Sequence, residues 1–225
     1  MKTDFIFDDI ESLMALWIDD SVVDTSELAR VADIAINSKV NFVSMPTNAV
    51  KIFWPWVESK NVKILTRLDF KIDMNHDVDT DVSVFAKNVT GVFRSGADGV
   101  QVFIPAAGIA EFVDAIYSIR NDLFFGRYLS VAIDVDNMGD LNWNCIFATL
   151  SRIKPDSILV FGNVEKFDAN SDFVGRIFDM LENWNLNADL HLMFGKNMLR
   201  VTQVLRLAER MRPEILKNMR VFMEK

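Results

Sequence analysis

The chain has 225 residues, of which 50% are hydrophobic and 25% are charged, and its formal net charge is −8. This composition excludes a disordered or collagen-like chain, and the negative charge argues against a protein that grips the nucleic-acid backbone. The apolar runs are far shorter than the roughly 18 to 20 residues that cross a bilayer, so no membrane-spanning helix is expected. The acidic start, with Asp4, Asp8 and Asp9, lacks the apolar core of a secretory signal. The single cysteine, Cys145, forms no internal disulfide, and we therefore expect a cytoplasmic protein.

Short apolar segments alternate with stretches of helical period along the whole chain, and no linker divides it. This alternation is typical of parallel βαβ units. The eight predicted strands are residues 14–18, 41–45, 62–70, 99–104, 128–135, 156–161, 188–194 and 215–223. The pattern predicts one domain over residues 1–225, folded as a compact (βα)8 TIM barrel rather than a doubly wound sheet. Because only a short tail follows Ile215, the last helix is expected to be short or missing.

Two local patterns between the strands make specific predictions. Residues 24–27 read Asp-Thr-Ser-Glu, a capping box in which Asp24 accepts from the amide of Glu27 and the Glu27 side chain reaches back. Trp54 and Trp56 flank Pro55, and they form either a packed kink or an exposed patch that contacts another subunit. We favour the second interpretation, which makes the protein a candidate homo-oligomer.

Five short motifs keep the order and spacing of the strand motifs in one known family. Ile18-Asp19-Asp20-Ser21-Val22-Val23 resembles Ile-Asp-His-Thr-Leu-Leu of the first strand, and Val131-Ala132-Ile133-Asp134 resembles Val-Ile-Ile-Glu of the fifth. The other three motifs are residues 43–47, 62–70 and 95–101. On these motifs the chain resembles the deoxyribose-phosphate aldolases, class I aldolases on a short (βα)8 barrel. The resemblance implies the same barrel and a small-molecule ligand, such as a phosphorylated sugar.

The residues that carry the chemistry of that family are replaced. Leu159 stands where the family has the sixth-strand lysine that forms the Schiff base, and His191 stands for a second lysine on the seventh strand. Gln101 replaces the fourth-strand Asp that transfers protons. An imine requires an amine, which neither an alkyl chain nor an amide supplies. The resemblance therefore implies a barrel without the imine mechanism of its relatives.

The active site of such a barrel forms at the carboxyl ends of the strands, so polar residues late in each strand are the candidates. We assign a candidate catalytic set of His191, Asp134, Arg67, Asp19 and Gln101. In this set His191 is the general acid or base, Asp134 is its partner, and Arg67 grips an anion. The other polar residues at the mouth are Ser44, Asp69, Asp136 and Asn163.

The alternative interpretation of the mouth is a buried network without catalysis, in which Arg67 bridges to Asp19, Asp69 or Asp134. These three acids exceed Arg67 by two negative charges. A divalent cation, a protonated carboxylate or a cationic substrate would each relieve that excess.

A turn after the seventh strand is a candidate phosphate site. Gly195, Lys196 and Asn197 occupy the place where the resemblance implies a glycine-rich turn with amides that point at an anion. The alternative is an ordinary turn from strand to helix. An acidic loop, with Asp73, Asp77, Asp79 and Asp81 around His76, lacks the glycine and terminal Glu of a calcium loop and is expected to be solvated. We therefore predict no metal and no cofactor.

Two functions follow from these patterns. The first is a lyase that acts on a small sugar phosphate or carbonyl compound without an imine, and it requires Arg67, Asp134 and His191 to converge in a deep pocket. The second is a catalytically inactive relative that binds a small anionic metabolite or serves as an oligomeric scaffold. It requires a mouth filled by Phe161, Met193 and Phe194, or carboxylates consumed by Arg67. Neither function calls for nucleic acid or a membrane as a partner.

Overall fold

Eight parallel strands close into a barrel in the computed structural model of the chain, and their spatial order is their order in the sequence. The structure describes residues 13–21, 24–38, 40–70, 78–104, 109–136, 143–162 and 171–224, without the side chains of residues 78, 79, 109, 110, 171 and 172. The strands are β1 Met14–Trp17, β2 Phe42–Met45, β3 Lys63–Asp69, β4 Gly99–Phe103, β5 Tyr128–Asp134, β6 Ser157–Phe161, β7 Asp189–Met193 and β8 Met219–Glu224. The predicted (βα)8 TIM barrel is confirmed.

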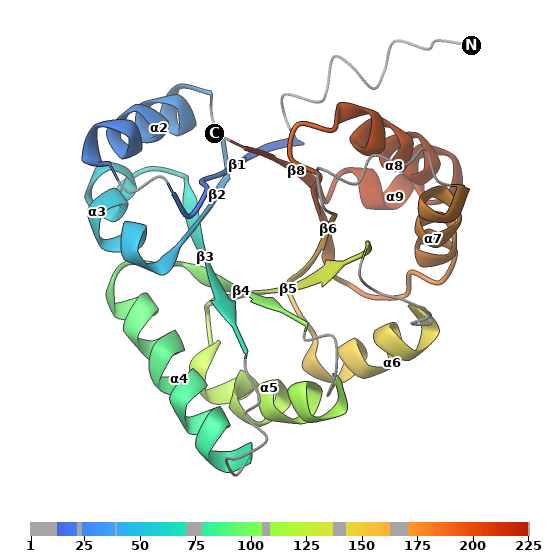
Figure 1. Cartoon of the computed structure of the whole chain (residues 1–225), viewed down its shortest axis with the longest axis horizontal. Coiled ribbons are helices and arrows are strands. Elements are labelled where there is room, and N and C mark those ends of the chain that lie inside the picture. Colours follow the sequence, from blue (N-terminus) through green and yellow to red (C-terminus); the bar gives the residue numbers. More distant parts are fainter. Residues whose placement is uncertain are drawn as a thin grey trace.

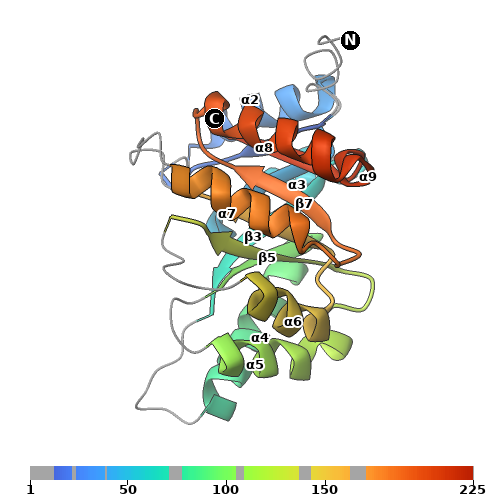
Figure 2. The same ribbon diagram turned by 90° about the vertical axis from the view of Figure 1, so that its right-hand side faces the viewer.

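Helices cover the outside of the ring of strands, as the view down the barrel shows (Figure 1). They are α2 Thr25–Asn37, α3 Thr47–Val57, α4 Val78–Arg94, α5 Ile109–Leu123, α6 Trp143–Ile153, α7 Ser171–Glu182, α8 Met198–Met211 and α9 Pro213–Leu216. In the view turned by 90°, α5, α6, α7 and α8 lie one above another along the side of the barrel (Figure 2). Within the described residues no helix follows β8, as the sequence predicts. None of the described helices is long and apolar enough to cross a membrane.

The closing strand starts later than the sequence pattern predicts. Residues 213–216 form the short helix α9, and β8 begins only at Met219. Pro213 stands in the first turn of α9, where its fixed φ and missing amide suit a helix. Ile215, which was predicted to begin the last strand, lies in this helix instead, and its side chain is buried. β8 then pairs with β7 and β1 and closes the ring.

The capping box predicted at α2 forms only in part. The Asp24 side chain accepts from the amide of Ser26 at 3.3 Å, rather than from the amide of Glu27. The Glu27 side chain forms an ion pair with Arg30 on the next turn and therefore does not reach back to the cap. The apolar stripe of α2 packs against the barrel as expected, and its buried members are Leu28, Val31, Ala32 and Ala35.

The Trp54-Pro55-Trp56 segment lies inside α3, and both tryptophans are half-buried against the core. Trp54 covers Gly96, where φ is +105° and an added Cβ would collide with the Trp54 side chain. Trp56 packs edge-on against Phe53. These contacts fit the packed-kink interpretation of the segment.

Two apolar cores hold the barrel together. The larger core lies between the strands and the helices, and the smaller core fills the inside of the barrel. The inner core contains Ala15, Phe42, Leu65, Ala132, Leu159, Met193 and Phe222. These side chains fill the interior of the barrel, as inward-facing residues do in this fold.

Candidate functional site

A pocket of about 350 Å³ opens at the carboxyl ends of the first four strands. The residues that line it are Trp17, Asp20, Pro46, Thr47, Arg67, Asp69 and Phe103. This is the face of the barrel on which a (βα)8 enzyme carries its active site. Two of the lining side chains, Arg67 and Asp69, were predicted for the mouth. The aromatic pair Trp17 and Phe103 was not, although both residues end their strands.

Arg67 is the central charged group of this pocket, and its side chain is only 9% exposed. Its Nη2 atom donates to the carbonyl oxygen of Ile18 and to Asp20 Oδ1, each at 2.6 Å. Its Nη1 atom donates to Ser44 Oγ at 3.2 Å, and the guanidinium lies 4.1 Å from the centre of the Trp17 ring. Burial lowers the pKa of Arg67, whereas the hydrogen bond and charge of Asp20 raise it. The guanidinium therefore stays cationic and is held in one place.

The sequence predicts that Arg67 pairs with Asp19, Asp69 or Asp134. Among the described residues its ionic partner is Asp20 instead. β1 ends at Trp17, so Asp19 and Asp20 both lie beyond the strand, where side-chain direction no longer alternates. Asp19 Oδ1 instead accepts from the amide of Ser21 at 2.8 Å. That hydrogen bond is the main reason why the pKa of Asp19 is lowered, and the charge of Arg67 adds to it.

A buried hydrogen-bond chain runs from Arg67 into the barrel. Ser44 Oγ, which accepts from Arg67, donates to Gln101 Oε1 at 2.5 Å. Gln101 is fully buried, and within the described part of the chain its Nε2 atom has no hydrogen-bond partner. Of the predicted catalytic set, the structure therefore brings Arg67 and Gln101 together through Ser44.

His191 lies deeper in the barrel than the predicted site. Its ring packs among Phe42, Tyr128 and Phe222, with ring centroids 5.3 to 6.1 Å apart. It is fully buried, and neither ring nitrogen has a hydrogen-bond partner among the described residues. Burial, assisted by the positive charge of Arg220, lowers the pKa of His191 to about 3. The imidazole is therefore neutral at physiological pH.

The strand register explains why His191 does not meet Asp134. His191 is paired with Leu159, and Leu159 with Ala132, so the row of partners that contains His191 meets β5 two residues before Asp134. Asp134 stands at the carboxyl end of β5, and its Oδ1 atom accepts from the amide of Asp136 at 2.9 Å. Both residues were predicted to lie late in their strands, although His191 is the middle residue of β7.

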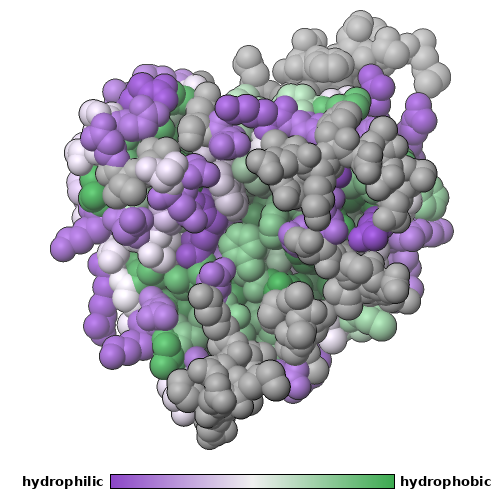
Figure 3. All heavy atoms as spheres, in the orientation of Figure 1, coloured by the Kyte–Doolittle hydropathy of each residue, from purple (hydrophilic) through white to green (hydrophobic). Residues whose placement is uncertain are grey.

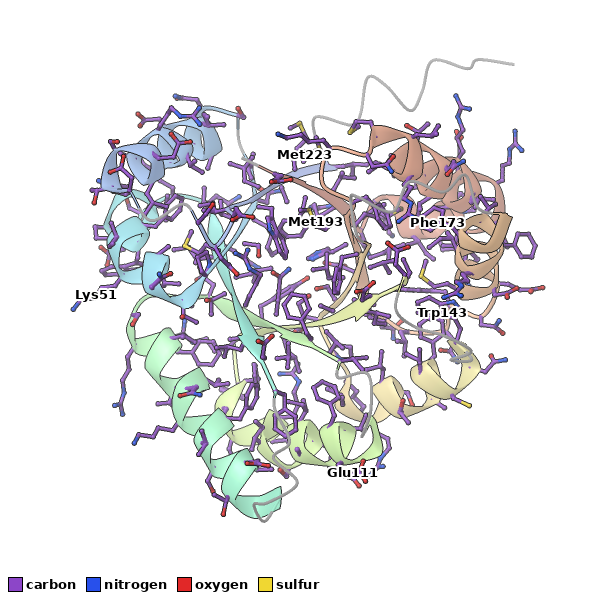
Figure 4. All side chains as sticks on the ribbon, viewed as in Figure 1. Lys51, Glu111, Trp143, Phe173, Met193 and Met223 are labelled. Carbon is purple, nitrogen blue, oxygen red and sulfur yellow. The ribbon has the colours of Figure 1, made fainter. Side chains whose placement is uncertain are left out.

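Apolar side chains fill the rest of the mouth. Phe103 and Phe161 pack edge to face, with ring centroids 5.1 Å apart. Met193 is 8% exposed and projects inside the ring of strands (Figure 4). The space-filling view shows hydrophobic side chains gathered at the centre of this face (Figure 3). Phe194, also expected in the mouth, packs instead against Phe173 in the outer core.

The candidate phosphate turn connects β7 to α8 and is tied together by its own hydrogen bonds. Gly195 is buried at φ +56°, and Lys196 is exposed. Asn197 caps α8, since its side chain accepts from the amide of Arg200 at 3.2 Å. The amide of Asn197 donates to the carbonyl of Phe194, and the next amide, of Met198, donates to that of Lys196. These bonds account for the turn without a bound anion.

Beside this turn, Arg200 and Asp136 form a buried ion pair that no sequence pattern predicted. Arg200 Nη1 lies 2.9 Å from Asp136 Oδ2, and the two side chains are 8% and 12% exposed. Gly162 makes room for the pair, because a Cβ there would lie 2.7 Å from the guanidinium.

The predicted acidic loop lies largely outside the described residues, and so does Asn163. Asp81, the last of the loop acids, is buried on α4. Among the described residues, no group of three or more His, Cys, Asp or Glu side chains could hold a metal ion.

No protein-family model matches the sequence, and no curated protein matches it. Solved structures do match. A deoxyribose-phosphate aldolase from Aeropyrum pernix, described as a tetramer, superimposes with a TM-score of 0.68 at 10% identity over 96% of this chain and 86% of that one. A putative deoxyribose-phosphate aldolase from Toxoplasma gondii ME49 gives 0.67 at 13% identity, over 96% and 89%.

The same fold also occurs with a different reaction. A D-psicose 3-epimerase superimposes with a TM-score of 0.59 at 12% identity, over 94% of this chain and 84% of that one. The likeness therefore defines the architecture and leaves the reaction to be argued from the site. In architecture, this chain is a (βα)8 barrel of the kind found in deoxyribose-phosphate aldolases, as its strand motifs predict.

Proposed function

We propose that this protein is a catalytically inactive aldolase-like barrel that binds a small anionic sugar derivative in the Arg67 pocket. The observation that carries the proposal is the state of Arg67, a buried guanidinium that lines an open pocket. The carbonyl of Ile18 and the hydroxyl of Ser44 hold it in position before any ligand arrives. Its ionic partner, Asp20, is 80% exposed and is free to turn toward solvent. A phosphate or carboxylate can then take its place on the guanidinium.

The other walls of the pocket suit the body of a sugar. Trp17 and Phe103 offer aromatic surface to the apolar face of a sugar ring. The Asp69 carboxylate accepts hydrogen bonds from hydroxyl groups, and the Thr47 hydroxyl both donates and accepts. A pocket of about 350 Å³ lies in the range of small-molecule sites.

The absence of imine chemistry is supported by the residues inside the barrel. Leu159, which replaces the family's lysine, is fully buried in the inner core. Among the described strand residues the one lysine is Lys63, at the amino end of β3 and thus opposite the mouth. Its ammonium lies 5.6 Å from the Phe42 ring. The general acid or base of the lyase hypothesis, His191, lies below the mouth and has a pKa of about 3.

Calorimetric titration of the full-length protein with deoxyribose 5-phosphate tests the proposal. Arg67→Met should weaken binding about tenfold to a hundredfold, because a hydrogen bond to a charged group contributes roughly 1.5 to 3 kcal/mol. Asp20→Asn should tighten binding about three- to tenfold, because it removes the carboxylate that competes for the guanidinium. Lys51→Met, on the outer surface of α3 (Figure 4), is the matched control and should change nothing.

The exposed position of Asp20 keeps this test independent of folding. Arg67 is buried, so weaker binding by Arg67→Met counts only if the melting temperature shows that the variant is folded. Asp20→Asn alters a solvated side chain and needs no such check. Equal affinity of wild type and Asp20→Asn for the sugar phosphate would contradict the exchange of anions at Arg67.

A lyase without an imine is the second candidate, and the unpaired amide of Gln101 favours it. Gln101 replaces the family's proton-transfer residue, and its buried Nε2 atom is a donor without a partner in the described part of the chain. In this reaction Asp134 takes the proton of the substrate hydroxyl as the carbon–carbon bond breaks, and Gln101 donates a hydrogen bond to the enolate oxygen. Asp134 then returns the proton to the enolate carbon, which gives the second aldehyde. Release of aldehyde from deoxyribose 5-phosphate by wild type, abolished in Gln101→Leu, would establish the lyase and overturn the binding proposal.

A further inference from the structure

A second groove lies at the other end of the barrel, where strands begin, and nothing in the proposed function uses it. Two adjoining pockets of about 360 Å³ each share Arg120, Phe124 and Gly126. One pocket lies between the ends of α5 and α6, and the other reaches Lys63 and Tyr128 at the start of β3 and β5. We call the two pockets together the N-terminal groove.

The N-terminal groove is basic in a protein that is acidic as a whole. Five basic side chains line it, against two lining carboxylates and Asp114, which pairs with Arg152 at 2.8 Å, whereas the whole chain carries a net charge of −8. The basic residues are Lys63, Arg120, Arg127, Arg152 and Lys154. The local surplus of two positive charges lies in a concave surface, and it raises the concentration of anions there.

The two carboxylates of the groove are engaged by the backbone. Asp98 Oδ2 accepts from the amide of Ile64, and Asp156 Oδ2 accepts from the amide of Leu129, both at 2.8 Å. Each Asp thereby caps the start of the preceding strand. Asp156 also accepts from Arg120 at 3.2 Å. Among the described residues that line the pocket between α5 and α6, which include Lys154, none is a carboxylate.

Aromatic side chains stand uncovered at the same place. Phe125 is 92% exposed, and Tyr117, on α5, is 52% exposed. Both line the pocket between α5 and α6, beside Phe124. The Arg152 guanidinium lies 5.7 Å from the Tyr117 ring centre, so cationic and aromatic groups already face one another. A planar ring bound here would stack on these side chains and cover them.

The backbone of the groove is also unusual. Lys154 is the one described residue other than glycine with a positive φ, at 52°. Its carbonyl accepts from Arg120 Nη2 at 3.3 Å, which fixes the loop before β6. Glycine would adopt this conformation with less strain, yet the residue at this position is a lysine that lines the pocket and adds a positive charge to it.

We propose that the N-terminal groove is a second binding site, for a small ligand that joins an aromatic ring to phosphate groups, as in a nucleotide. The basic side chains contact the phosphates, and Tyr117 and Phe125 contact the ring. The volume matches a small molecule rather than a polymer. The site lies at the opposite end of the barrel from the mouth, so it can be tested independently of the Arg67 pocket.

Titration calorimetry of the full-length protein with ATP, in buffer free of divalent metal, tests this site. ATP should bind, and pyrophosphate and adenosine should each bind at least about tenfold more weakly, because each retains half of the contacts. Lys154→Gly and Phe125→Ser should each weaken ATP binding about three- to tenfold, which corresponds to the loss of one contact. Neither variant threatens the fold, since glycine relieves the positive φ and Phe125 is exposed.

Two control variants distinguish the N-terminal groove from the Arg67 pocket and from the general surface charge. Lys51→Met and Arg67→Met, the latter with a melting temperature that shows it to be folded, should leave ATP binding unchanged. Loss of ATP binding in Arg67→Met alone would place the nucleotide at the mouth and overturn the proposal. It would equally be overturned if ATP fails to bind, if both groove variants bind it like wild type, or if a polyglutamate peptide occupies the groove and ATP does not.

Discussion

Replacement of His191 by phenylalanine should stabilise the protein. His191 is fully buried among three aromatic rings, and both nitrogens lack hydrogen-bond partners in the described part of the chain. A buried polar group without a partner costs about 1 to 3 kcal/mol. Phenylalanine removes this cost and keeps the ring, although its slightly larger volume offsets part of the gain. We expect His191→Phe to raise the free energy of unfolding by about 1 to 2 kcal/mol near neutral pH.

The same burial predicts how stability depends on pH. The pKa of His191 falls from 6.5 to about 3 on folding, so the unfolded chain takes up the proton first as the pH is lowered. The contribution of His191 is therefore intact above about pH 6.5 and is lost progressively down to about pH 3. At about pH 5 the loss reaches about 2 kcal/mol, since each pH unit below the unfolded pKa is equivalent to about 1.4 kcal/mol.

Urea unfolding followed by circular dichroism, at about pH 7.5 and about pH 5, measures both effects. His191→Phe should exceed wild type by about 1 to 2 kcal/mol at the higher pH and by about 3 to 4 kcal/mol at the lower. His191→Gln is the matched control, because it removes the titration but keeps a buried polar amide. Relative to wild type, His191→Gln should gain about 2 kcal/mol at about pH 5, as His191→Phe does from the lost titration, and should gain nothing at about pH 7.5. A His191→Phe variant that is destabilised and retains the pH dependence of wild type would refute this reasoning.

Three further variants test individual contacts, each by its free energy of unfolding in urea. Asp24→Ala removes the acceptor for a first-turn amide of α2 and should cost about 1 kcal/mol; an unchanged value would mean that the cap is dispensable. Asp136→Asn removes the negative charge that pairs with the buried guanidinium of Arg200 and should cost about 3 kcal/mol, whereas a loss below about 1 kcal/mol would contradict a buried pair. Gly99→Ala drives a Cβ into the carbonyl oxygen of Tyr128, and a loss of at least about 2 kcal/mol is expected; a neutral result would contradict this close approach of backbones.

Much of the architecture could be predicted from the sequence because the barrel repeats one simple unit. Each strand is a short apolar run, and each following helix has its own stripe, so the alternation alone gives the strand order. The exception, residues 213–216, shows the limit of that pattern. The apolar pair Ile215 and Leu216 suits a helix or a strand equally, and Pro213, in the first turn, favours the helix.

The candidate site was harder to predict, because the position of a residue along its strand does not show what surrounds its side chain inside the barrel. His191 and Gln101 both stand in mid-strand, yet His191 lies among rings and Gln101 joins the chain that leads to Arg67. The partner of Arg67 was missed for a related reason. Asp20 follows the end of β1, where side-chain direction no longer alternates, so no sequence period selects it over Asp19.

We propose above all that this barrel holds its ligand without a covalent bond. Incubation of the protein with deoxyribose 5-phosphate and sodium borohydride, followed by mass spectrometry of the intact chain, tests this most directly. An imine would be reduced to a stable adduct on a lysine, and because the sequence resemblance implies that Leu159, buried in the inner core, replaces the reactive lysine, we predict an unchanged mass. A protein whose mass increases by one reduced sugar phosphate, attached to a single lysine, would contradict a non-covalent barrel.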